Sequence, residues 1–80
     1  MKILFYGPLA DAIAREIDID VGSACTIGSV RNRLAGDHRD AAEALTSTRS
    51  HAVAGGSLVT DDHVVSGDEI IEFLPPVSGG

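Results

Sequence analysis

The chain has 80 residues, of which 44% are hydrophobic and 22% charged, so we expect one small globular domain and exclude a multidomain enzyme. Twelve acidic and six basic residues give a net charge of −6, which argues against binding to nucleic acid or to anionic membrane surfaces. The single cysteine, Cys25, excludes an internal disulfide and the four-cysteine ligation of most iron–sulfur clusters. The apolar start, Met1 to Tyr6, is too short for a signal peptide or a membrane span, so we expect a cytoplasmic protein.

Two strands are expected in the first quarter of the chain. Residues 2–6 are β-branched and aromatic, and Gly7-Pro8 ends them in a turn. Ile3 and Phe5 share one face of this strand. Residues 15–21 alternate apolar and polar side chains, which predicts a second strand whose carboxylates face solvent.

The main helix is predicted to begin after Thr26, a good N-cap residue. Ile27, Val30 and Leu34 then recur with the spacing of one helical face, and Gly36 is expected to close the helix. The arginines between them are expected on the solvated side of this helix.

Short elements fill the second half of the chain. They are a helix over 40–46 with Ala41, Ala42 and Leu45 inward, strands over 51–54 and 57–59 joined by Gly55-Gly56, and a last strand over 69–74. Pro75-Pro76 ends the last strand because proline cannot donate to a sheet. This order predicts an α+β roll, with one main helix packed across a mixed sheet and the first and last strands side by side.

The C-terminus, Pro75-Pro76-Val77-Ser78-Gly79-Gly80, is the most informative segment. A segment that feeds its α-carboxylate into another protein's active site must be thin, extended and unhindered at the reacting carbon. Two terminal glycines meet these demands, and six residues from Pro75 reach roughly 20 Å. The alternative interpretation is a frayed end without function.

The segments that carry a family resemblance are the ending FLPPVSGG, the opening KILFY, Thr26-Ile27 and the acidic turn at 66–69. Through them the sequence resembles the small subunit of molybdopterin synthase, a ubiquitin-like sulfur carrier with the β-grasp fold. The resemblance spans the whole chain and implies a β-grasp domain over 1–75 and a flexible Gly-Gly tail over 76–80. In that family an E1-like enzyme uses ATP to convert the terminal glycine to a glycyl adenylate. A sulfur donor of the cysteine desulfurase or rhodanese type then yields the thiocarboxylate, a C-terminal 1-thioglycine.

The resemblance thus implies that Gly80 carries sulfur, while Pro75, Pro76, Val77, Ser78 and Gly79 insert into the large synthase subunit. There the sulfur moves to a cyclic pyranopterin to build the dithiolene of molybdopterin. The chain would be no enzyme on its own and would bind no cofactor or metal. It would act in a heterotetramer, with two small subunits flanking a large-subunit dimer.

Tyr6, Leu58 and Leu74 match positions of the family's exposed apolar patch, which docks on both the activating enzyme and the large subunit; the alternative is ordinary core packing. The chain departs from the family pattern at Ala10-Asp11 and Ala54-Gly55. It also has one extra residue before Pro75, for which we expect a bulge or a different start of the last strand.

Other interpretations of function remain open. Sulfur carriers for thiamine or cysteine synthesis share the Gly-Gly end, and a ubiquitin-like protein modifier or a binding module without chemistry at its end is a different class. His38, His51 and His63 are too scattered for a metal motif, and Arg31 and Arg33 are expected on a solvated helix face.

Overall fold

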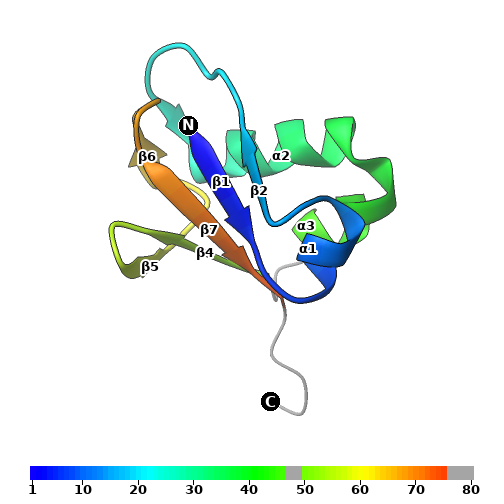
Figure 1. Ribbon diagram of the computed structural model, residues 1–80. Coiled ribbons are helices and arrows are strands. Elements are labelled where there is room, and N and C mark those ends of the chain that lie inside the picture. The colour runs from blue at the N-terminus through cyan, green and yellow to red at the C-terminus, as the bar shows by residue number, and fades with distance from the viewer. Residues whose placement is uncertain (47–49, 76–80) are drawn as a thin grey trace.

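A mixed sheet of five strands forms the centre of the computed structural model, which describes residues 1–46 and 50–75 (Figure 1). The strand order is β2-β1-β7-β4-β5. The strands are β1 (Lys2–Phe5), β2 (Glu16–Asp18), β4 (His51–Ala54), β5 (Ser57–Val59) and β7 (Ile70–Leu74). β1 and β7 pair in parallel, and the other neighbours pair antiparallel, which confirms that the first and last strands lie side by side.

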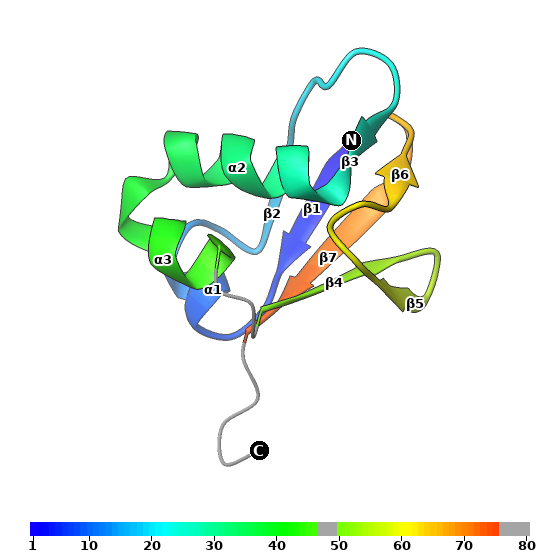
Figure 2. The same ribbon diagram turned by 180° about the vertical axis from the view of Figure 1, so that it is seen from behind.

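One face of this sheet is covered by the main helix, α2 (Ile27–Asp37), which crosses it diagonally (Figure 2). Three shorter helical segments lie on the same side: α1 (Pro8–Ala12), a 3-10 turn over Arg39–Ala41, and α3 (Ala42–Thr46). The predicted α+β roll with one main helix on a mixed sheet is therefore confirmed. Within residues 1–46 and 50–75, no helix has the length and apolar character needed to cross a membrane.

The core lies between α2 and the inner face of the sheet. Its largest side chains are fully buried: Phe73, Ile3, Leu9, Ile27, Leu34, Leu45, Ile71, Val30 and Val65. Phe5 and Phe73 face each other across the parallel pair, with ring centroids 6.1 Å apart. The strict alternation along β1 and β7 thus sends one set of side chains into the core and the other set to the opposite face.

Local capping explains where α2 begins and ends. The Thr26 hydroxyl accepts a hydrogen bond from the backbone N–H of Ser29, as the sequence predicts. The end was predicted at Gly36, but the helix continues to Asp37, because the N–H of His38 still bonds to the carbonyl of Leu34 at 2.8 Å.

Three features of the strands differ from the sequence prediction. The strand predicted over 15–21 covers only Glu16–Asp18, because its partner β1 begins at Lys2, which pairs with Asp18. The strands β3 (Cys25–Thr26) and β6 (Val64–Val65) form a separate antiparallel pair beside the start of α2, and two-residue strands carry too few residues to show a period. The bulge considered for the last strand is absent over Ile70–Leu74, where pairing with both neighbours is one-to-one. The strand instead starts at Ile70, one residue later than predicted.

The expectation that Arg31 is solvated is wrong. Its side chain is buried between α2 and the sheet, with its guanidinium 5.2 Å from the centre of the Phe73 ring. It donates hydrogen bonds to the Leu45 carbonyl at 2.6 Å, to the Ser50 carbonyl at 3.5 Å and to the Asp61 carboxylate at 3.1 Å. Since a buried cation is tolerated only when it is fully partnered, Arg31 ties three segments of the chain together.

Candidate functional site: the outer sheet face and the end of β7

The candidate site lies on the outer face of the sheet, defined here as the face opposite α2. Strand register aligns one row of side chains across it: Glu16, Leu4, Glu72, Val53 and Leu58 on five successive strands. No helix of the described residues covers this face (Figures 1 and 2). Apolar side chains from these strands therefore meet solvent.

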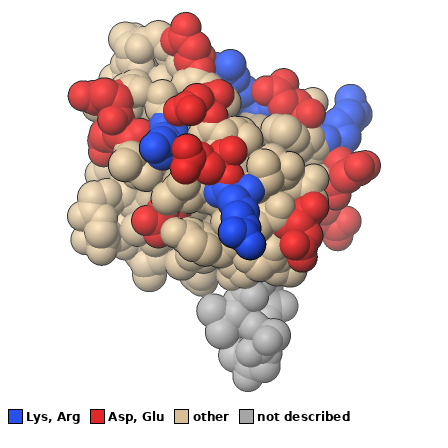
Figure 3. All heavy atoms as spheres, in the orientation of Figure 1, with Lys and Arg blue, Asp and Glu red and all other residues tan. Residues whose placement is uncertain are grey.

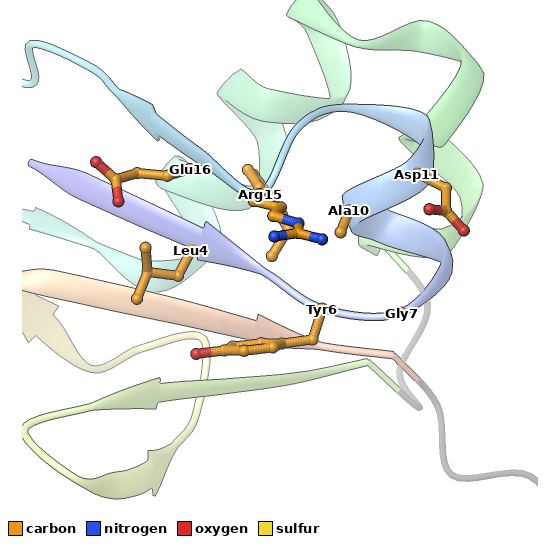
Figure 4. Close-up of a pocket in the computed structure, with 8 residues that line it drawn as sticks. Leu4, Tyr6, Gly7, Ala10, Asp11, Arg15 and Glu16 are labelled. Atoms are coloured by element: carbon orange, nitrogen blue, oxygen red, sulfur yellow. The ribbon is translucent and has the colours of Figure 1, made fainter.

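The three residues predicted as a partner patch all lie on this face. Leu58 is 65% exposed on β5, Tyr6 is 43% exposed just beyond β1, and Leu74 is half-buried at the end of β7. The Tyr6 ring extends over the outer side of β7 toward β4 (Figure 4). The alternative of core packing fails for Leu58 and Tyr6, because both are largely open to solvent.

Three further apolar residues belong to the same face, and sequence analysis missed them. Leu4 and Val53 are half-buried, and Ile70 is 51% exposed. Together with Tyr6, Leu58 and Leu74 they form what we call the outer patch. Alternation within β1 and β7 could have identified Leu4 and Ile70, since their neighbours Ile3 and Ile71 belong to the core.

Charged groups on the same face gather over β1 and β2, whereas the surface over β4 and β5 is mostly uncharged (Figure 3). Lys2 and Glu16 form an exposed ion pair at 3.6 Å. Glu72 lies half-buried in the row between Leu4 and Val53. A partner for this face must therefore match an apolar surface with a carboxylate in its middle.

A shallow hollow of about 570 Å³ adjoins the outer patch where β1 passes into α1 (Figure 4). Leu4 and Tyr6 line one side, Ala10 and Asp11 of α1 line another, and Arg15 reaches in between. The departure from the family pattern at Ala10-Asp11 falls in this hollow. Its mixture of apolar and charged groups is typical of the rim of a protein interface.

The C-terminal segment leaves the sheet beside this patch. β7 is a central strand, paired with β1 on one side and β4 on the other, and its last residue Leu74 pairs with His51 of β4. The buried Ser50 hydroxyl donates a hydrogen bond to the Leu74 carbonyl at 3.3 Å. Pro75 follows directly and is half-buried.

The remaining predicted site residues, Pro76, Val77, Ser78, Gly79 and Gly80, lie outside the described residues. So does the predicted tail over 76–80 as a whole. The structure describes the domain predicted over 1–75 up to its last residue, apart from 47–49.

Two titratable groups with shifted pKa values lie on exposed turns. Hydrogen bonds from the Thr60 hydroxyl to Asp62 and from the Ser66 hydroxyl to Asp68 lower the pKa of each carboxyl group. In the part of the chain that the structure describes, no three His, Cys, Asp or Glu side chains are grouped to hold a metal ion. Cys25 is half-buried on β3.

Known proteins resemble this chain along its whole length. The molybdopterin synthase sulfur carrier subunit of Escherichia coli K12 is 25% identical over 80 residues, covering 100% of this chain and 99% of the relative. The crystal structure of SAMP1 from Haloferax volcanii superposes with a TM-score of 0.79 at 22% identity, covering 99% of this chain and 97% of the other. A structure of Haloferax volcanii small archaeal modifier protein 1 gives a TM-score of 0.78 at 19% identity and 95% coverage of both chains.

No protein-family model matches the sequence. The structural neighbours confirm the predicted ubiquitin-like β-grasp fold. The full-length similarity to the Escherichia coli subunit confirms the resemblance predicted from the ending FLPPVSGG. The chain is therefore a β-grasp protein that resembles the small, sulfur-carrying subunit of molybdopterin synthase.

Proposed function

We propose that this chain is a ubiquitin-like sulfur carrier, the small subunit of a molybdopterin synthase, and that Gly80 carries the sulfur. The observation that supports this most is the similarity over the full length of both chains to a sulfur carrier subunit, with the Gly-Gly end in place. In the sequence, Pro75 and the residues after it follow β7, which is a central strand of the sheet.

The chemistry proposed for Gly80 proceeds in two activation steps. A carboxylate oxygen attacks the α-phosphorus of ATP; a new P–O bond forms, and pyrophosphate leaves. In the second step the terminal sulfur of a persulfide on the sulfur donor attacks the carbonyl carbon and AMP leaves, giving an acyl disulfide. A thiol then attacks the S–S bond, which releases the thiocarboxylate and leaves a disulfide between that thiol and the donor. Direct displacement of oxide from the carboxylate by sulfur is difficult. Adenylation divides this substitution into easier steps, because AMP is a far better leaving group than oxide.

The thiocarboxylate is ionised and nucleophilic at neutral pH, so it suits sulfur delivery to a cyclic pyranopterin held by the large subunit. The activating enzyme binds the ATP, and the large subunit supplies the catalytic cations. This chain contributes the carrier end and its docking surface and is not catalytic alone.

We assign docking on both partners to the outer patch. Large aromatic and aliphatic side chains at the centre of an interface supply most of its affinity. Tyr6, Leu58 and Ile70 are exposed side chains of this kind. Six acidic and one basic residue in the second half of the chain favour a basic partner surface, so salt should weaken the association.

Mixing the chain with the large subunit of a molybdopterin synthase tests this function. Light scattering at low salt should find two small subunits on a large-subunit dimer, and thiocarboxylated chain should convert the pterin precursor to molybdopterin. A complex that fails to form at low salt would refute the partner assignment.

A second candidate is a protein modifier, because both solved neighbours carry the name small archaeal modifier protein 1 or its abbreviation. In that role the activated Gly80 would be attacked by a lysine amine, giving an isopeptide and releasing AMP. Incubation with an E1-like enzyme, ATP and a cell extract, followed by peptide mass spectrometry, separates the two. A lysine linked to a C-terminal peptide of this chain through Gly80 favours the modifier, and a thiocarboxylate without conjugates favours the carrier.

A further inference from the structure

The turn after β1 touches the base of the C-terminal segment. Gly7, which connects β1 to α1, lies directly against the ring of Pro75. Figure 4 shows Gly7 at this turn, next to the point where β7 ends. The contact follows from topology, because β1 and β7 are parallel neighbours and Phe5 pairs with Phe73, so both strands finish at the same edge.

A side chain at position 7 is disfavoured on two grounds. The backbone there has φ +60° and ψ −138°, in a region that L-residues avoid. In addition, a Cβ at Gly7 would lie 3.0 Å from Cγ of Pro75 and 3.8 Å from Cβ and Cδ of the same ring. A proline ring cannot rotate away as a long side chain can, so Pro75 would have to give by a few tenths of an ångström, through a change of ring pucker or a shift of its backbone.

Leu74, the residue before Pro75, is held by the sheet. Leu74 is bound into the sheet through its pairing with His51, and its carbonyl accepts the hydrogen bond from Ser50. Because Leu74 precedes a proline, its own backbone is confined to extended conformations. The Gly7 contact therefore acts on Pro75 at the first residue that the sheet does not hold by pairing.

From these contacts we propose that Gly7 is a positioning residue for the C-terminal segment. It sets the direction in which the chain leaves β7, by giving the Pro75 ring a close-fitting backbone surface to rest on. The reaction affected is the proposed activation of Gly80, so the functional part of this inference rests on the proposed function. Gly7 touches neither substrate nor reacting atoms.

The test compares Gly7→Ala with a matched control, Gly22→Ala. Gly22 also has a positive φ, of +70°, so alanine there also suffers backbone strain, but a Cβ at that position meets no heavy atom within 4 Å. Both variants should lower the melting temperature by a few degrees. Of the two variants, only Gly7→Ala should shift the NMR signals of Leu74 and Pro75. Of the two glycines, only Gly7 should show a cross-peak from its Hα to the Pro75 ring in the parent protein.

Kinetics supply the second readout. With an E1-like enzyme, ATP and labelled pyrophosphate, Gly7→Ala should lower kcat/KM of ATP–pyrophosphate exchange by roughly tenfold or more relative to Gly22→Ala, since small misplacements of a reacting group are costly. Pro75→Ala removes the Cγ that meets the new methyl group. In that background, Gly7→Ala should cost no more than Gly22→Ala does.

The outcomes divide cleanly. Equal kcat/KM for Gly7→Ala and Gly22→Ala, or no change in the signals of Pro75, overturns the inference. If Gly7→Ala does not fold, folding of the double variant with Pro75→Ala supports the contact. If neither variant folds, the parent protein decides, because absence of a cross-peak between Gly7 Hα and the Pro75 ring overturns the inference. If the parent protein shows no adenylation at all, the proposed function fails, while the NMR comparison still decides the contact.

Discussion

The two faces of the sheet are formed by the same strands but differ in the burial of their apolar side chains. On the inner face Phe73 and Ile71 are fully buried against α2, whereas on the outer face Ile70 and Leu58 remain more than half exposed. The difference cannot come from composition, since both sets are large and apolar. It shows that burial of one face is sufficient for the fold, so the apolar side chains of the other face are available for a partner.

The largest effect should come from breaking the inner face. Phe73→Ala removes a fully buried ring that packs on Phe5 and lies under Arg31, and should lower the free energy of unfolding by about 3–5 kcal/mol. The adjacent Leu74→Ala, on the outer face, should cost about 1 kcal/mol because its side chain is only half-buried. Urea unfolding measures both, and equal losses would contradict the division into two faces.

Removing the buried cation should have the next largest effect. Arg31→Ala leaves the carbonyls of Leu45 and Ser50 without their donor and should cost about 2–3 kcal/mol. Arg33→Ala, on the exposed side of the same helix, should stay within about 0.5 kcal/mol. Thermal and urea unfolding compare them; a loss at Arg31 no larger than at Arg33 would refute the network.

On the outer face the expected change is in binding rather than stability. Leu58→Ala should leave the free energy of unfolding within about 0.5 kcal/mol and weaken binding to an activating enzyme or large subunit about tenfold. The matched control is Val64→Ala, since Val64 is 59% exposed but lies on β6, outside the five-stranded sheet. Titration calorimetry that finds both variants equally affected would exclude the outer patch as the docking surface.

The smallest expected effect is on the fall of the melting temperature at acidic pH. The pKa values of Asp62 and Asp68 are lowered in the folded protein by hydrogen bonds from Thr60 and Ser66. The two ionised carboxylates therefore contribute fully to the free energy of unfolding above the ordinary carboxyl pKa. This contribution is lost as the pH falls through the lowered pKa values. Thr60→Val and Ser66→Ala should flatten the decline of the melting temperature below about pH 4. An unchanged decline in both would show that these hydrogen bonds do not stabilise the fold.

Local signals in the sequence were enough for the elements they concern. The Thr26 cap, the alternation in β1 and the paired glycines of the β4–β5 hairpin each act over a few residues, and the structure has those elements where the sequence predicts them. Gly55 and Gly56 both adopt positive φ, as the tight turn requires.

Contacts between distant residues could not be predicted in the same way. The partners of Arg31 lie 14, 19 and 30 residues away, so its spacing within α2 carries no sign that it is buried. The outer patch was predicted only in part. Tyr6, Leu58 and Leu74 came from a family resemblance, whereas membership of Val53 depends on the register of β4 against β7.

The proposed separation between a folded domain and a reacting end is tested most directly by intact-mass analysis. The parent chain and a variant lacking Gly79 and Gly80 are each incubated with an E1-like enzyme, ATP and a sulfur donor, with a known carrier converted in parallel. The account predicts that the parent exchanges one oxygen for sulfur, that the shortened chain does not, and that both unfold within about 0.5 kcal/mol of each other. An unmodified parent beside a converted control, or a shortened chain that still accepts sulfur, would contradict it.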